Sequence, residues 1–351
     1  MLTIVSFAGV LILLILVHEF GHFITAKLAG VKVEEFGLGF PPKIFGFKVG
    51  ETEYTLNMVP LGGFCRLLGE EDPKEKRSLA SRNKGIRILV LSAGSLMNLV
   101  LPFFLFTASF MVPHPVFSEQ VRVESVSPDS PAAAAGIQPG DVILEINGAE
   151  VKNRADLTIN IRRNLGKEIK LLLKNSQEAP RTVTLVPRLN PPSEQGAIGI
   201  LLSPPEMTGA KETKPVWEAV PLGIKTTWDT LVLFRNEIAG WFITKQAPEV
   251  SGPIGIARFT GVVAQAGLGP LLAFTAIISI NLAIVNLLPV PGLDGGRLVF
   301  VFLEFFMRGK RISPARERIV HFIGFAMLIS LVLLVSYFDV MRLVSGDSLF
   351  P

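Results

Sequence analysis

The N-terminal segment of this chain, residues 3–28, is almost wholly apolar but contains His18, Glu19 and His22. It is longer than the ~20 residues that cross the hydrocarbon core of a bilayer. It has neither a basic leading region nor a small-residue cleavage site, so we predict a retained span. An ionisable side chain in mid-bilayer costs on the order of 2–3 kcal/mol or more. Three of them in one span therefore indicate a functional site within the membrane.

The composition agrees with a multi-pass membrane protein. Of the 351 residues, 49% are hydrophobic, and the mean hydropathy is +0.47. Three further apolar blocks, at 87–112, 270–306 and 319–338, predict four spans with both termini on one side. The third block is interrupted by LPVPGLDGG at 288–296. The formal charge of +4 includes no basic cluster interleaved with aromatic residues, which argues against nucleic-acid binding. The single cysteine, Cys65, excludes an intramolecular disulfide.

Positive charge predicts the orientation of the spans, because short cytosolic loops are rich in lysine and arginine. Two loops carry such clusters, one before the second span and one between the last two spans. The clusters are Lys74, Lys76, Arg77, Arg82, Lys84 and Arg87, and Arg308, Lys310, Arg311, Arg316 and Arg318. Both loops are predicted to be cytosolic, which places the termini and segment 113–268 on the opposite face.

The loop at 31–66 alternates apolar and polar residues around glycine and proline, which predicts β-hairpins. Its apolar content suggests that it dips into the membrane face, although an ordinary cytosolic hairpin is the alternative. Residues 216–245 have the pattern of an amphipathic helix pair. Three tryptophans there suit the membrane interface or packing on a neighbouring domain, namely Trp217, Trp228 and Trp241.

Segment 115–190 has the strand and turn pattern of a small α+β domain. It resembles a circularly permuted bacterial PDZ domain. The resemblance depends on Ser130-Pro131, Ala135-Gly136, Pro139-Gly140-Asp141 and Asn147-Gly148. A PDZ fold implies a groove that takes peptides by strand addition. The sequence has no clear GLGF-type carboxylate loop at the expected place.

The chemistry of the first span follows from its spacing. His18 and His22 are four residues apart, so a helix places both imidazoles on one face, where they can share a metal. Glu19 lies one residue on, within reach of a water on that metal. This is the HExxH pattern of zinc hydrolases.

Zinc requires a third protein ligand. His114 lies at the far end of the second span and His321 at the start of the fourth, and both are poorer candidates than Asp294. Asp294 lies in the proline- and glycine-rich break at 288–296. A broken helix at membrane depth usually lines a cavity, where a carboxylate needs a metal or a charge as its partner.

The chain closely resembles the site-2 proteases, which are intramembrane zinc metalloproteases. The resemblance depends on HEFGH at 18–22, AGSLMN at 93–98, SGPIGI at 251–256 and SINLAIVNLLPVPGLDGG at 279–296. It implies Zn²⁺ bound by His18, His22 and Asp294, with Glu19 as general base. It also implies that Asn281 and Asn286 line the site and bind the substrate backbone or its oxyanion, whereas Gly94 and Asn98 are interpreted as structural.

The resemblance further implies a substrate helix that must unwind before cleavage. The β-rich loop is expected to supply an edge strand for it, with the FGLGF stretch as the contact, in particular Phe36, Gly37, Leu38 and Gly39. The expected substrates are single-pass membrane proteins such as an anti-sigma factor, or a remnant signal peptide. The PDZ domain would admit only substrates that are already trimmed.

The predicted fold is therefore a multi-pass α-helical membrane protein with four transmembrane helices, a membrane-associated β-hairpin region and a small α+β PDZ domain. The predicted regions are 1–112 (two spans and the β loop), 113–190 (PDZ), 191–268 (linker with interfacial helices) and 269–351 (two spans with the LDG motif). The expected location is a cell inner membrane, with the PDZ domain on the periplasmic side and the active site near the cytosol.

Two other functions are compatible with parts of this pattern. A divalent-metal transporter would also place histidine and aspartate within spans, but it would not need Glu19. A membrane scaffold with a dead catalytic remnant would be expected to have lost one of the four site residues, and none is lost. The intramembrane protease explains more of the sequence than either.

Overall fold

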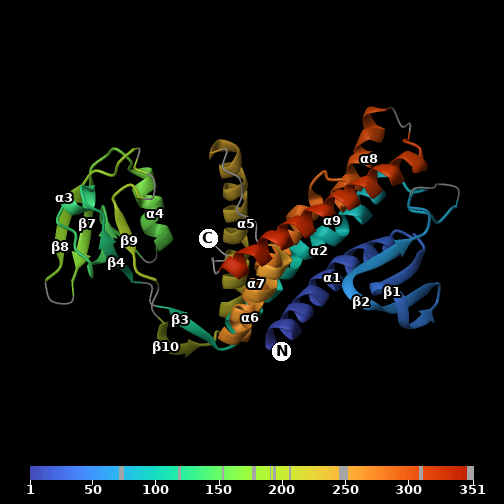
Figure 1. Cartoon of the computed structure of the whole chain (residues 1–351), viewed down its shortest axis with the longest axis horizontal. Coiled ribbons are helices and arrows are strands. Elements are labelled where there is room, and N and C mark those ends of the chain that lie inside the picture. Colours follow the sequence, from blue (N-terminus) through green and yellow to red (C-terminus); the bar gives the residue numbers. More distant parts are fainter. Residues whose placement is uncertain are drawn as a thin grey trace. The chain divides into compact units, whose positions relative to one another are not determined.

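The computed structural model describes residues 1–70, 75–117, 120–151, 154–175, 179–189, 191–192, 195–204, 207–244, 252–307 and 311–345. The chain divides into two compact units (Figure 1). One is mainly helical and contains Met1–His114 and Thr213–Pro351; the other is Pro115–Glu212 and contains the whole of a six-stranded sheet. Lys74, Arg308, Lys310 and Ser251, which the sequence analysis used, lie outside the described residues.

Helices occupy all four apolar blocks of the sequence. The helical unit contains α1 (Leu2–Leu28), α2 (Lys84–Met111), α5 (Val216–Thr244), α6 (Pro253–Ala266), α7 (Leu268–Leu287), α8 (Asp294–Phe306) and α9 (Pro314–Ser345). In the described part of the chain, α1, α2, α7 and α9 are long and apolar enough to cross a membrane. The third block is broken between α7 and α8, as its proline and glycine residues predict.

Helix α2 packs against α1, α5, α7 and α8. One apolar cluster joins α1, α2 and α8 through residues that include Ala26, Val90 and Val301. The backbones of α1 and α2 approach closely, because a Cβ atom on Gly21 would overlap the carbonyl oxygen of Ala93. Small residues allow this kind of close helix packing in membranes. The packing holds the HEFGH end of α1 against α2.

The loop after α1 is a sheet of two long strands, β1 (Val33–Val49) and β2 (Thr52–Leu67), which lies beside α1 (Figure 1). The prediction of β structure is therefore confirmed. Residues 35–38 of β1 pair with residues 53–56 of β2 and also with residues 63–66. The first half of β1 is thus central in this sheet, and the last part of β2 forms an edge.

The second unit has a sheet in the order β8-β7-β5-β4-β9, with β6 paired to β5. Its elements agree with the predicted strand and helix pattern. They are β4 (Val121–Val126), α3 (Pro131–Ala134), β5 (Val142–Ile146), β6 (Ala149–Glu150), α4 (Arg154–Arg163), β7 (Ile169–Lys174), β8 (Arg181–Leu185) and β9 (Ile200–Leu202). One buried apolar cluster joins the sheet to both helices. The short strands β3 (His114–Phe117) and β10 (Met207–Glu212) form a separate pair.

The predicted helix pair at 216–245 is wrong, because α5 is one continuous helix. Pro221 lies near its start, where the missing N–H and the displaced carbonyl disturb only the first turns. The helix packs on α2, and Gly223 allows the close approach to Thr107. Trp217 and Trp228 are 73% and 66% exposed. The side chain of Trp241 lies outside the described part of the chain.

Candidate metal centre

The two histidines of the HEFGH motif face one point on α1, as their helical spacing predicts. Both side chains are buried. Their Nε2 atoms lie 3.3 Å apart, and the ring planes are nearly perpendicular, at 77°. Two imidazole nitrogens this close need either a shared proton or a shared cation, and two neutral imidazoles are common ligands for a metal.

Asp294 reaches the same point from the other end of the sequence. Its Oδ2 atom lies 3.1 Å from His18 Nε2 and 3.2 Å from His22 Nε2. Asp294 is the first residue of α8, directly after the break. A Cβ atom on Gly295 would overlap the carbonyl oxygen of Leu288, so the turn that places Asp294 needs glycine there. The break in the third apolar block thus delivers the carboxylate.

The three side chains have the composition of a zinc site. Their ligand atoms all lie within 4.8 Å of one another, and two nitrogens with one carboxylate oxygen match catalytic zinc sites, which keep a further position open. A Cβ atom on Gly94 of α2 would overlap His22 Nε2 and lie 2.7 Å from His18 Nε2. Glycine at this position leaves the ligand atoms free, so the residues present fit a zinc ion.

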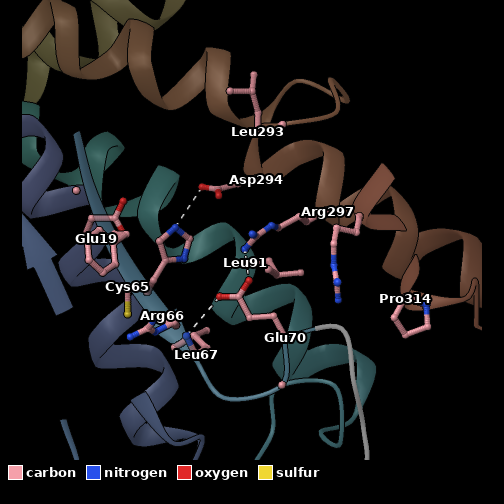
Figure 2. Close-up of a pocket in the computed structure, with 16 residues that line it drawn as sticks. Glu19, Cys65, Arg66, Leu67, Glu70, Leu91, Leu293, Asp294, Arg297 and Pro314 are labelled. Carbon is pink, nitrogen blue, oxygen red and sulfur yellow. Dashed lines mark hydrogen bonds and ion pairs between the residues drawn. The ribbon is translucent and has the colours of Figure 1, made fainter. Parts of the chain in front are cut away.

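A cavity of about 710 Å³ opens beside these ligands. Glu19, His22 and Asp294 line it from the helices, and β2 lines it with residues 63–67. Figure 2 shows Glu19 and Asp294 in this cavity, with Arg297 directed at Glu70. Glu19 therefore lines the same cavity as two of the three possible ligands.

An ion pair connects two walls of the cavity. Arg297 lies one helical turn after Asp294, and its Nη1 atom is 2.7 Å from Oε2 of Glu70. Glu70 follows the end of β2 and also accepts a hydrogen bond from the Leu67 N–H. The sequence analysis missed this pair and the 63–67 wall. The three-residue spacing on a helix could have predicted that Arg297 lies near Asp294. The position of Glu70 depends on tertiary structure and could not be predicted in this way.

Other predicted site residues lie elsewhere. Phe36, Gly37, Leu38 and Gly39 do not line the cavity, and Phe36 instead packs against Phe23 and Tyr54. The expectation that this stretch offers a free edge is wrong for residues 36–38, because their backbones are paired on both sides.

The asparagines and the two remaining histidines also lie outside the cavity lining. On α7, Asn281 is exposed and Asn286 is half-buried. His114 contacts the Val112 carbonyl near the end of α2. His321 of α9 accepts a hydrogen bond of 3.0 Å from the Gly292 N–H, so it supports the turn before Asp294. Neither histidine joins the metal centre, as the sequence analysis expected.

Burial raises the pKa of the Cys65 thiol on the cavity wall, with the nearby charges of Glu19 and Glu70 acting in the same direction. The thiolate is the form of cysteine that binds metals and attacks electrophiles. We therefore interpret Cys65 as a packing residue.

Comparison of the sequence with known proteins identifies the family of this chain. The profile of peptidase family M50 matches residues 6–331. This chain belongs to peptidase family M50. A protein of Clostridium acetobutylicum is 38% identical over 93% of this chain and 94% of its own length. The zinc metalloprotease RasP of Geobacillus kaustophilus is 31% identical over 97% of this chain and 98% of its own length.

Two further similarities belong with these. The regulator of sigma-W protease RasP of Bacillus subtilis is 29% identical over 97% of this chain and 99% of its own length. Among solved structures, the PDZ domain of an SdrC-like protein of Listeria monocytogenes is 27% identical, over 25% of this chain and 90% of that one. Its TM-score is 0.22, and no assignment depends on it.

Membership of the M50 peptidases establishes the class of activity. The chain is a zinc metalloprotease of the site-2 protease family, and its cofactor is Zn²⁺. With its apolar helices it is a multi-pass membrane protein, and its activity is intramembrane proteolysis. This favours the protease over the transporter and the inactive scaffold among the functions that the sequence left open.

Proposed function

We propose that this M50 peptidase hydrolyses peptide bonds within the transmembrane segments of single-pass proteins, at a zinc ion held by His18, His22 and Asp294. The observation that carries the proposal is the convergence of these ligand atoms within 4.8 Å, beside a cavity that Glu19 lines together with His22 and Asp294. Residues 18 and 294 lie 276 positions apart in the sequence, so chance clustering of metal-ligating side chains is a poor explanation.

Glu19 is the proposed general base. Zinc, when bound, supplies an activated water and a Lewis acid for the scissile carbonyl. Glu19 takes the proton of the attacking water and then gives it to the leaving amine. Asn281 and Asn286 are included as hydrogen-bond donors to the substrate, although neither lines the cavity of the free chain.

The substrate is proposed to bind as an extra strand. Peptides within a helix hide their carbonyl groups, so a transmembrane segment must unwind before a water can reach one. Residues 63–67 of β2 line the cavity, and no further strand pairs with their outer edge in the described part of the chain. Backbone N–H and C=O groups on such an edge bind an extended peptide in a sequence-tolerant way. Phe36, Gly37 and Leu38 then pair with the inner side of this edge, and Gly39 follows them in β1.

The second unit is proposed to be a PDZ domain on the extracytoplasmic face of a bacterial inner membrane, with the metal centre near the cytosol. Charge in the short loops supports this orientation. The proposed regions keep the predicted bounds, 1–112, 113–190, 191–268 and 269–351, except that β9 extends the sheet of the proposed PDZ domain into the third region. The Bacillus subtilis relative is named for regulation of sigma-W. By analogy, we propose an anti-sigma factor as substrate, or a remnant signal peptide.

The test measures zinc content and cleavage of a single-span substrate in detergent. Wild type is expected to bind one zinc and to cleave. Glu19→Gln should keep zinc but lose cleavage, and Asp294→Ala should lose zinc. Glu218→Gln is the matched control, because that carboxylate is exposed on α5 and pairs only loosely with Lys214, at 3.7 Å. Cleavage by Glu19→Gln at the wild-type rate would refute the assignment of the base.

A further inference from the structure

The two histidines differ in what their second ring nitrogens contact. A histidine that binds a metal through Nε2 carries its proton on Nδ1 and usually donates it to a nearby acceptor, which fixes the ring. For His22, Nδ1 lies 2.7 Å from the backbone carbonyl oxygen of Val90. For His18, the group in this place is the side-chain amide of Asn98, 3.4 Å from Nδ1. One histidine thus uses a backbone acceptor, and the other depends on a side chain.

Asn98 is completely buried, and its Oδ1 atom has no hydrogen-bond partner among the described residues. A buried amide oxygen without a hydrogen-bond partner destabilises the folded state. The two ends of a carboxamide are told apart only by the hydrogen bonds that they make. Turning the amide by 180° places Oδ1 against His18 Nδ1, where it accepts the imidazole proton. That turn gives Oδ1 a hydrogen-bond partner and leaves His18 Nε2 free to bind a metal, while Nδ2 takes the buried position in which no described residue partners the amide.

The backbone around Asn98 is held in place for this role. Its carbonyl oxygen accepts a 2.8 Å hydrogen bond from the Ser279 hydroxyl of α7. Asn98 lies one turn after Gly94 on α2, and Gly94 faces the same two histidines. Helix α2 therefore presents to the metal centre first a residue without a side chain and then an amide.

We propose that Asn98 is a positioning residue, whose Oδ1 atom accepts the Nδ1 proton of His18 and thereby fixes the tautomer and ring orientation needed for zinc. This inference rests on the proposed function, because it requires His18 to be a ligand. Loss of such a second-sphere partner typically weakens metal binding by about 10–100-fold. The sequence analysis interpreted Asn98 as structural, and the proposal replaces that interpretation.

The test compares the zinc affinity of Asn98→Leu and Asn98→Asp with that of wild type, by chelator competition in detergent. Leucine keeps the volume without an acceptor, and aspartate keeps the acceptor. Asn98→Leu is expected to bind zinc about 10–100-fold more weakly, and Asn98→Asp to bind within a few-fold of wild type. The visible spectrum of the Co²⁺-substituted protein should change in Asn98→Leu but stay close to wild type in Asn98→Asp.

Two controls separate this proposal from its alternatives. Ser109→Ala removes a buried side-chain hydrogen bond to the Phe106 carbonyl farther along α2 and does not touch Asn98, so it should keep wild-type zinc affinity. His18→Ala tests the ligand set itself. Loss of zinc by His18→Ala with unchanged affinity in Asn98→Leu would overturn the role of Asn98 alone. Unchanged zinc affinity in His18→Ala would overturn the proposed ligand set. Equal weakening in Asn98→Leu and Asn98→Asp would show that packing or the amide N–H, and not an acceptor, is required.

Discussion

At the residue scale, the candidate metal centre depends on the absence of a side chain at position 94 of α2. Gly94 has no Cβ, and the space that a Cβ would fill is next to Nε2 of both histidines. The glycine lies in the middle of α2, where it costs roughly 0.5–1 kcal/mol relative to alanine. The helix accepts this cost, and the ligand atoms remain accessible.

The first prediction is that Gly94→Ala loses zinc. The added methyl group would force His18 and His22 out of position, and a misplacement of ~1 Å lowers activity on the order of 100-fold. Metal analysis of the purified protein and a cleavage assay measure the outcome. Gly85→Ala in the same helix is the matched control, because its nearest contact would be an ordinary 3.5 Å from Asn83. A Gly94→Ala protein with full zinc content would contradict the prediction.

Individual residues of the site differ in how far the sequence predicts them. His18 and His22 follow from the helical period alone, and Asp294 follows from the cost of a carboxylate at membrane depth. Gly94 and Asn98 could be assigned only through the resemblance. Their contacts with the histidines arise from the packing of α2 on α1, which no local pattern in either helix encodes.

At the element scale, α8 is fixed at both of its ends. Asp294 begins the helix at the metal centre, and Glu304 in its last turn is buried against Arg87 of α2, with oxygens 2.7 and 2.8 Å from Nη1. Lys84 Nζ also contacts the Glu304 carbonyl oxygen at 3.2 Å. Helix α8 therefore connects the start of α2 to the candidate metal centre.

The second prediction concerns this buried pair. Glu304→Gln leaves the Arg87 charge buried without its partner, which costs about 3–5 kcal/mol. We expect a lower thermal midpoint in detergent and weaker zinc binding, because α8 carries Asp294. The double variant Arg87→Met with Glu304→Leu should recover most of the stability, since neither charge remains. An unchanged midpoint for Glu304→Gln would argue against the role of the pair.

The third prediction concerns the turn between β1 and β2. Hydrogen bonds from Arg77 and then Lys27 lower the pKa of the Glu51 carboxyl from 4.5 to about 2. Because the pKa of Glu51 is lower in the folded state, its ionised carboxylate stabilises the fold. That stabilisation is complete above pH ~4.5 and is lost as the pH falls toward 2. We expect protection of amides 49–53 from hydrogen exchange to decrease between pH 5 and pH 2.5.

Glu51→Gln is the control for this pH dependence. It should show weak protection already at pH 5 and no further loss on acidification beyond the intrinsic exchange rate. The effect should be small, because the side chains of Lys27 and Glu51 are about a third exposed and that of Arg77 is half exposed. Equal protection in wild type and variant at pH 5 would show that the pair does not hold the turn.

The sequence predicts the type of these elements better than their arrangement. Alternation of residues in 31–66 predicts strands, yet it does not show that residues 35–38 pair on both sides and that 63–67 form the edge. That depends on the long-range register of β2. The helix pair predicted at 216–245 is one continuous helix, and Pro221 does not interrupt it because it lies near the start of α5.

At the scale of the whole molecule, the two ends of the second unit lie side by side. Strands β3 and β10 pair with each other at its two ends. A closed stem of this kind allows a domain to be removed with little effect on the rest of the fold. The helical unit contains all the proposed zinc ligands and the general base.

The fourth prediction is that replacing Val121–Leu202 with a short glycine-serine linker leaves an active protease. If the second unit acts as a size filter, the shortened protein should cleave a substrate that still has its bulky ectodomain, which wild type should resist. Cleavage of a trimmed substrate by both proteins is the control for folding. Continued resistance of the untrimmed substrate in the shortened protein would show that the second unit is not the filter.

The break between α7 and α8, which places Asp294 late in the chain, has a consequence for the biosynthesis of the enzyme. His22 and Asp294 are 272 positions apart in the chain, and ribosomes deliver the N-terminal helix first. A nascent chain that already carries α1, the β loop, α2 and the entire second unit still lacks the carboxylate. If Asp294 is the third zinc ligand, as proposed, such a chain cannot cleave the other new membrane proteins around it. Proteolytic competence then begins only when α8 has been made.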